Sequence, residues 1–201
     1  NLQYGVARIM NLANGEVLVL GALASFWLYT TSQISPLLTV VLVAPISFIG
    51  NWLIYRFLLT PLVRRSKTQS HLEVDSILAT FGMSFILIGI MVSIEGGFFA
   101  YKYLSTAISI FGSTTSLSRF VAFLIAVLIG GLLYLWLNHT RSGVAVRAVS
   151  VSTEASGLVG INVPRVSALA FALGGAITAV GGALISTFIT LDASIGVVFT
   201  L

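Results

Sequence analysis

The residues best suited to bind a polar solute form one short segment, NLANGE, from Asn11 to Glu16. Its two amides and one carboxylate stand between apolar runs, where unpaired polar groups are costly and often mark a solute path. Two hypotheses fit this pattern. A helix starts at the membrane surface, with Asn14 as its N-cap and Glu16 in its first turn. Alternatively, a helix breaks within the membrane and presents a translocation path, bordered by Asn11, Asn14, Gly15 and Glu16.

Two hydroxyl residues in a later apolar run, Thr80 and Ser84, lie one helical turn apart and therefore on one face. They are candidates for the same path. We favour the alternative for both, which is a hydrogen bond from each hydroxyl to a carbonyl group of its own helix.

Enzymatic chemistry is not indicated. His71 and His139 have no HExxH spacing and no neighbouring carboxylate cluster, so we interpret them as solvated loop residues. The sequence has no phosphate loop of the GxxxxGK[ST] type and no cysteine. We predict no catalytic residue, no metal site and no cofactor in this chain, and we find no nucleic-acid motif.

Membrane helices must position these residues. Only 8% of residues are charged, against about a quarter in a typical soluble domain. A helix needs about 20 apolar residues to cross a bilayer, and a turn-forming cluster at Thr31–Pro36 divides the longest uncharged stretch. The sequence predicts an all-α, polytopic integral membrane helix bundle in a single domain over residues 1–201. Its five spans lie at about 17–31, 37–58, 77–94, 120–137 and 167–190, with partial helices at 2–10 and 195–201.

Both ends of the sequence suggest a piece of a longer protein, because it lacks an initiator Met and stops inside an apolar run.

The basic residues are unequally divided between the two sides of the predicted bundle. Loops on one side hold Arg8, Arg56, Arg64, Arg65, Lys67, Arg141, Arg147 and Arg165, and loops on the other hold only Lys102 and Arg119. The positive-inside rule then assigns residues 55–75 and 138–165 to the cytoplasm.

The cytoplasmic loop at 138–166 predicts a short docking helix. Ser152 or Thr153 can be its N-cap, and Glu154 falls in its first turn, where a carboxylate meets the positive end of the helix dipole. Gly160 suits a left-handed C-terminal position, and Pro164 prevents continuation. A soluble partner could bind such a helix.

The last span carries small residues at intervals of four: Ala170, Gly174, Thr178 and Gly182. Rows of this kind let helix backbones approach closely in membranes. We therefore interpret the row as a helix-packing surface.

Several segments resemble ABC importer permeases of the branched-chain amino acid (LivH) type. NLANGE is similar to that family's N-[FL]-A-H-G-E signature, with Asn14 where the family usually has His. LATFGMSFIL (78–87) resembles its T-x-G-x-S helix opening. The segments TRSGVAVRAVS (140–150), GLVGINVPRV (157–166) and FALGGAITAVGGAL (171–184) also resemble the family's, in the same order.

The resemblance implies a permease subunit in a bacterial cytoplasmic (inner) membrane that moves branched-chain or related amino acids. It also implies four partners: a second permease, two cytoplasmic ATPase subunits and a periplasmic solute-binding protein. EASGLVG (154–160) resembles the E-A-A-x-x-x-G element of ABC importers, which implies that Glu154, Ala155, Leu158 and Gly160 contact the ATPase. Arg141, Arg147 and Arg165 either support that contact or only set the topology.

Three alternatives stay open. Permeases of similar sequence carry urea or short amides. A secondary transporter or channel that needs no ATPase is less favoured, because no predicted span has an internal charge and no repeat is found. An intramembrane hydrolase would need a Ser/His or paired Asp arrangement within spans, which is absent.

Overall fold

The computed structural model of the protein describes residues 2–65, 69–95, 97–101, 103–104, 106–110 and 113–200. It is helical almost throughout. The long helices are α2 (Asn14–Ser32), α3 (Pro36–Ile54), α5 (Gln69–Ile94), α6 (Leu117–His139) and α9 (Val163–Ile185). The short helices are α1 (Leu2–Ala7), the π-helix η1 (Tyr55–Leu59), α4 (Thr60–Arg65), α7 (Arg141–Val151), α8 (Thr153–Leu158) and α10 (Gly196–Thr200).

Four helical stretches among the described residues are long and apolar enough to cross a membrane: Pro36–Val63, His71–Ile94, Leu117–His139 and Val163–Ile185. The all-α membrane bundle and the partial helices at both ends are thus confirmed, but the count of five spans was wrong. The predicted span at 17–31 forms α2, which carries Glu16 in its first turn and the polar residues Thr30–Ser32 at its end. Its apolar part is therefore shorter than the roughly 20 residues that a full span needs.

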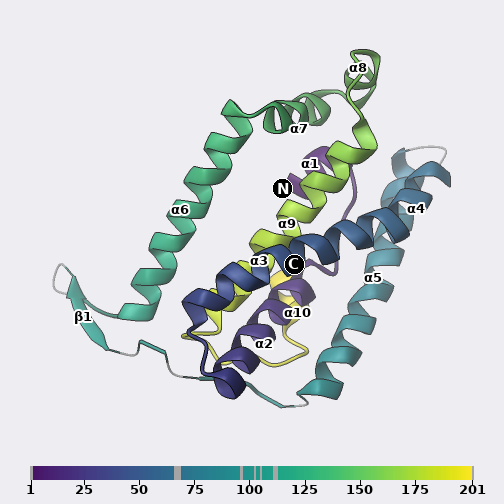
Figure 1. Cartoon of the computed structure of the whole chain (residues 1–201). Helices are drawn as coiled ribbons and strands as arrows, with labels where there is room; N and C mark the ends of the chain where they lie inside the picture. The colour runs from purple at the N-terminus through teal and green to yellow at the C-terminus, as the bar shows by residue number, and fades with distance from the viewer. Residues whose placement is uncertain are drawn as a thin grey trace.

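Helix α9 is the centre of the bundle (Figure 1). In its most apolar stretch, 61% of the residues are buried inside the chain, whereas the corresponding share for α6 is 0%. Small residues on α9 make this central position possible. Asn51 of α3 lies so close to Gly175 that a Cβ at the glycine would overlap its side chain, and the Ala179 backbone leaves no room for a Cβ at Gly21 of α2.

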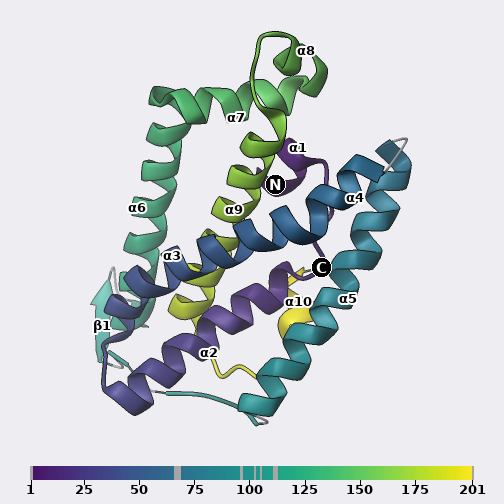
Figure 2. The same cartoon turned by 45° about the vertical axis from the view of Figure 1, so that its right-hand side comes forward.

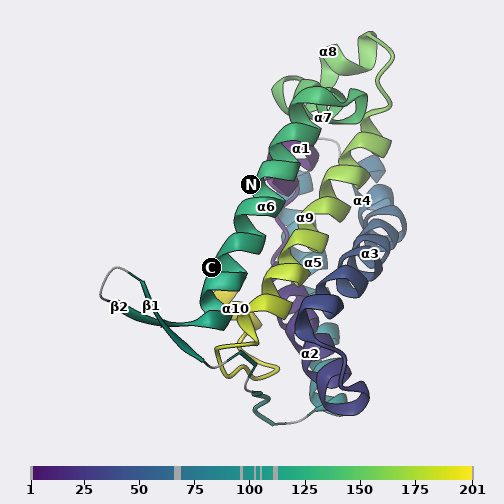
Figure 3. The same cartoon turned by 60° about the vertical axis from the view of Figure 1, so that its left-hand side comes forward.

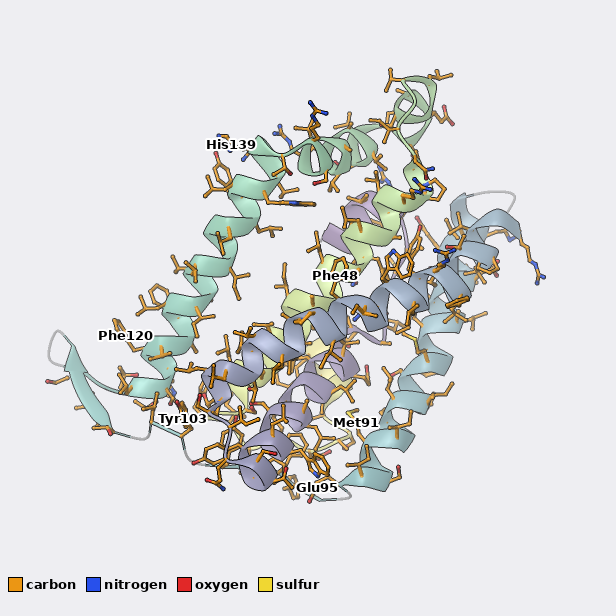
Figure 4. All side chains as sticks on the ribbon, in the orientation of Figure 1. Phe48, Met91, Glu95, Tyr103, Phe120 and His139 are labelled. Carbon is orange, nitrogen blue, oxygen red and sulfur yellow. The ribbon has the colours of Figure 1, made fainter. Side chains whose placement is uncertain are left out.

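The two ends of the bundle differ in character. Helices α7 and α8 lie across one end, at the top of Figures 1 and 2, and the end of α4 and the start of α5 lie toward the same end. Figure 4 shows His139 at that end and Glu95 and Tyr103 at the other. The arrangement agrees with the alternation used for the positive-inside count, except that Arg8 begins the irregular stretch between α1 and α2. Lys67 and Lys102 lie outside the described residues.

The connection between α5 and α6 contains a two-stranded antiparallel hairpin that the sequence analysis did not predict. Strands β1 (Ala107–Ile110) and β2 (Ser113–Ser116) pair with Ala107 opposite Ser116. The hairpin projects from the bundle beside the start of α6 (Figure 3). Nearby, Phe99 and Leu191 exchange backbone hydrogen bonds of 2.9 and 3.2 Å, which tie this connection to the segment after α9.

Candidate functional site

The polar segment begins in an irregular stretch of backbone between α1 and α2. Arg8 opens this stretch in the left-handed region, with a φ of 54°. Further along it, the Leu12 N–H donates a 3.1 Å hydrogen bond to Thr80 Oγ1. Thr80 lies within about one helical turn of the middle of the span His71–Ile94. The irregular backbone therefore lies near mid-membrane depth, where it survives only against protein or water.

This depth favours a broken helix over a helix that starts at the membrane surface. The expected cap is also absent, so that part of the surface hypothesis was wrong. Ala13 is the N-cap residue of α2 and makes no side-chain cap hydrogen bond, whereas Asn14 is already helical. Glu16 does lie in the first turn, as expected.

Asn11 organises the irregular stretch. Its Oδ1 accepts a 3.1 Å hydrogen bond from the Ala13 N–H, a local turn that asparagine commonly makes. Its Nδ2 donates to Gln3 Oε1 at 3.3 Å. Gln3 in turn donates from Nε2 to the Phe171 carbonyl of α9 at 3.0 Å. Asn11 is thereby connected to the central helix through the side chain of Gln3.

Asn14 lies beside the same central helix, nearer to the C-terminal end of that helix. Its Oδ1 is 3.4 Å from the Thr178 hydroxyl. That hydroxyl has one hydrogen, and the shorter contact of 2.9 Å to the Gly174 carbonyl takes it. The Asn14 amide is therefore held only weakly and keeps hydrogen-bonding capacity for another group.

Glu16 is the most unusual residue of the segment. Its side chain is fully buried, and neither carboxylate oxygen has a hydrogen-bond partner among the described residues. It packs against α10: a Cβ at Gly196 would lie 3.1 Å from the Glu16 carboxyl carbon. Burial of a carboxyl group without a partner is strongly unfavourable, and polar groups kept at such positions in membrane proteins are often functional.

Gly15 allows α10 to approach so closely. Its N–H donates a 2.8 Å hydrogen bond to Thr200 Oγ1, and a Cβ at this position would overlap the Gly196 carbonyl oxygen. The start of α2 and the C-terminal end of α10 lie side by side in Figures 1 and 2.

Thr80 and Ser84 are both buried on α5. The Thr80 hydroxyl donates to the Ser76 carbonyl of its own helix at 2.7 Å and also accepts from Leu12. Thr80 is thus brought to the polar segment, and its hydroxyl bonds back to the helix as the sequence analysis favoured.

The small-residue row of α9 faces the N-terminal part of the chain along its whole length. Ala170 packs with Val6 of α1. The Gln3 side chain lies against Gly174, and the Leu18 carbonyl oxygen lies against Gly182 so closely that a Cβ would overlap it. With Thr178 beside Asn14, the row follows α1, the irregular stretch and α2 in turn.

Sequence reasoning missed Asn51. This residue of α3 is buried with its Oδ1 unpaired, while its Nδ2 donates to the Ser47 carbonyl at 2.9 Å. It closes one end of an apolar pocket of about 240 Å³ whose other lining residues come from α2, α3, α5 and α9. An asparagine within a predicted span was the available signal, because polar residues in spans are rare and often functional.

The loop at 138–166 forms two helices rather than one. Thr140 caps α7, whose buried face, Val146 and Val149, packs on the bundle. Ser152 caps α8 through a 3.2 Å hydrogen bond from the Ala155 N–H. The N-cap of α8 is therefore Ser152 and not Thr153, the two residues that the sequence left open. Pro164 does not end α8, which stops at Leu158, but lies in the first turn of α9.

Helix α8 presents an exposed surface at the end of the bundle. Leu158 is 89% exposed, and Glu154 and Ala155 of the same helix are also exposed. Val151, the last residue of α7, is 84% exposed. Gly160 then has a φ of 83°, the left-handed conformation predicted for it. Exposed apolar side chains of this kind make the surface a candidate for contact with a partner.

A hydroxyl cluster fastens the opposite end. Tyr101 Oη lies 2.9 Å from Ser25 Oγ and 3.1 Å from Ser186 Oγ, which joins the α5–α6 connection to α2 and to the end of α9. Burial raises the pKa of Tyr101, against the opposing effect of these hydrogen bonds. The hydroxyl is therefore neutral near pH 7 and serves as a structural link.

The sequence matches known permeases over its length. LivH, the high-affinity branched-chain amino acid transport system permease protein of Salmonella typhimurium, is 28% identical over 200 aligned residues, which cover 92% of this chain. The Escherichia coli K12 protein of the same name is 27% identical over the same extent. A probable LivH of Methanocaldococcus jannaschii is 27% identical over 192 residues. No solved structure gives a significant match.

The chain spans 63% of the length of the Salmonella and Escherichia proteins and 59% of the Methanocaldococcus protein. The family model for the branched-chain amino acid transport system / permease component matches residues 1–201. The chain therefore belongs to the family of branched-chain amino acid transport system permease components.

Proposed function

We propose that the protein is the permease subunit of an ATP-driven importer that moves branched-chain or related amino acids across a bacterial cytoplasmic membrane. It would act with a second permease subunit, two cytoplasmic ATPase subunits and a periplasmic solute-binding protein. ATP hydrolysis belongs to the partner subunits, and this chain contributes the path and the coupling surface. The permease names of its relatives support this assignment.

One observation carries the proposal. A single helix, α9, connects the exposed helix α8 to the polar break near mid-membrane depth. At its start, Asn162 caps it through a 3.1 Å hydrogen bond from the Arg165 N–H, and the Ile161 N–H donates to the Ser156 carbonyl of α8 at 3.0 Å. Further along, Thr178 lies beside Asn14.

This connection suggests a mechanical cycle. ATP closes the ATPase dimer, and the partner moves the surface of Glu154, Ala155 and Leu158. The left-handed turn at Gly160 passes the movement to α9. Because α9 packs against both α1 and α2, its displacement changes how the two halves of the broken helix meet.

Asn11, Asn14, Gly15 and Glu16 border the path in this proposal, with Thr80 and Ser84 behind them. In the arrangement described here, α10 covers Glu16. Separation of α10 from α2 would expose the carboxylate, which suits the ammonium group of an amino acid. The amide of Asn14 is available for the carboxylate or carbonyl end of the solute.

Reconstitution tests the proposal. The full-length protein, co-purified with its native partners, is placed in proteoliposomes with ATP inside and loaded binding protein outside. Uptake of leucine, isoleucine or valine that requires ATP supports the importer. Uptake of urea or acetamide instead would replace the substrate. Leucine uptake in vesicles stripped of ATPase subunits would favour a secondary transporter or channel.

A further inference from the structure

A groove lies between α3 and α9 in the half of the bundle that carries α7 and α8. Its volume is about 590 Å³, and its described lining residues are Phe48, Ile49, Trp52, Arg56, Ser142, Arg165, Val166 and Leu169. Figure 4 shows Phe48 near the middle of α3. The groove therefore extends from the end of the bundle toward the membrane interior.

Its polar and apolar parts are separated along this direction. Helix α3 runs toward the α7–α8 end and α9 runs away from it, so Arg56, Arg165 and Ser142 lie nearest that end. Phe48, Ile49 and Leu169 lie deeper. The groove thus has cationic groups at the level of the membrane surface and an apolar wall below them.

The groove is built from packed helices. Tyr55 of η1 and Phe171 of α9 lie in ring contact, with centroids 5.5 Å apart, and they share a buried cluster with Leu59 and Ala168. Trp52 packs against this cluster and forms part of the wall. The side walls are therefore fixed independently of the two arginines.

Arg56 has an unusual backbone setting. It lies in the π-helix, where the Thr60 N–H bonds to the Tyr55 carbonyl five residues earlier. A widened turn suits this position because Pro61 has no N–H to continue the α-helical pattern. The Arg56 guanidinium lies 5.1 Å from the centre of the Trp52 ring, which orients it at the groove.

The charged residues that line the groove are of one sign. No Asp or Glu is among the described residues that line the groove. Arg56 also lines an adjacent cavity of about 400 Å³ together with Arg65. Neither cavity has an acidic residue in its described lining, so an anion is the complementary ligand.

We propose that this groove binds an anionic glycerophospholipid of the cytoplasmic leaflet, with its phosphate at Arg56 and Arg165 and one acyl chain along Phe48, Ile49 and Leu169. Basic pockets between membrane helices on this side bind acidic lipid headgroups. The amphipathic lining selects a lipid over a soluble phosphate, which would leave the apolar wall exposed. The bound lipid would stabilise the α3–α9 contact beside the start of the proposed lever.

Native mass spectrometry of the full-length complex tests this proposal, with titration of phosphatidylglycerol and of zwitterionic phosphatidylethanolamine. Each arginine near an anionic headgroup contributes about 1 kcal/mol, or roughly fivefold in affinity. Arg56→Gln with Arg165→Gln should weaken phosphatidylglycerol binding about 25-fold and leave phosphatidylethanolamine binding unchanged. The control is Arg141→Gln with Arg147→Gln, which removes the same charge from exposed positions of α7 outside the groove.

Equal phosphatidylglycerol binding by the groove variant and the control variant would overturn the proposal. So would displacement of the lipid by soluble glycerol 3-phosphate at equal concentration, or absence of a bound lipid because a partner subunit covers the groove. A photoactivatable phosphatidylglycerol gives a second measurement on the unaltered complex. Its acyl chain should crosslink to α3 and α9 near Ile49 and Leu169, and labelling confined to other helices would contradict the site.

Discussion

Gly182 of α9 lies against the Leu18 carbonyl oxygen of α2 with no room between them for a Cβ. This approach is tighter than the one at Gly174 of the same row, and it joins the central helix to the helix that carries Glu16. A Cβ at the neighbouring residue, Gly181, would have no atom of another segment within 4 Å. The two glycines therefore form a matched pair on one helix.

Gly182→Leu should force α9 and α2 apart and sharply reduce the yield of assembled complex, because membrane helices associate through close backbone packing. Gly181→Leu should leave the yield near that of the unaltered protein. Size-exclusion chromatography of the co-purified complex measures both. Equal yields from the two variants would show that close packing of Gly182 against α2 is not needed for assembly.

Gly174→Leu on the same row should also reduce assembly, but less. Its added atoms meet the side chain of Gln3, 2.6 Å from a Cβ position, and a side chain can move where a backbone carbonyl cannot. Complex yield should fall between those of the Gly181 and Gly182 variants. A greater loss of complex yield than for Gly182→Leu would show that assembly tolerates added atoms at Gly174 less well than at Gly182.

The sequence predicted the helices far better than their contacts. Charge-free stretches identify spans because backbone in lipid must satisfy its own hydrogen bonds, and the Ser152 cap is local chemistry. The short apolar length of α2 was missed because a stretch without charges can still contain polar residues. Glu16 and Thr30–Ser32 limit the apolar part of this helix at its two ends. The hairpin at 107–116 and the pocket at Asn51 depend on pairings between distant segments, which single-sequence patterns do not encode. The neighbours of Glu16 on α10 are invisible for the same reason.

Glu16→Gln keeps the size and shape of the side chain but replaces its carboxyl group with an amide that carries no charge. If Glu16 meets the ammonium of the solute, the complex should assemble and leucine uptake should fall roughly 10- to 100-fold. This range follows from the loss of a charge-assisted hydrogen bond, about 1.5–3 kcal/mol. Glu16→Asp should retain more uptake than Glu16→Gln. Unchanged uptake in the glutamine variant would mean that Glu16 is a neutral packing residue.

Ala155→Cys should form a crosslink to a cytoplasmic ATPase subunit, because Ala155 is exposed on α8 beside Leu158. The adjacent Ser156 is 3% exposed, so Ser156→Cys is the control and should crosslink poorly. Mass spectrometry of the crosslinked products identifies the partner. Labelling of Ala155→Cys only by reagents restricted to the periplasmic side would overturn the proposed orientation.

The proposed cycle depends on Gly160 to pass movement from α8 to α9, and this coupling is measured as the amount of leucine imported per ATP hydrolysed. Proline fixes φ near −65°, which is incompatible with the 83° at Gly160, and it removes the N–H that bonds to the Gly157 carbonyl at 3.1 Å. Gly157→Ala is the control, because a Cβ there has nothing within 4 Å. Gly160→Pro complexes should assemble and bind loaded binding protein, yet import little leucine and hydrolyse ATP without response to it. Leucine import per ATP equal to that of Gly157→Ala would show that Gly160 does not couple the two sites.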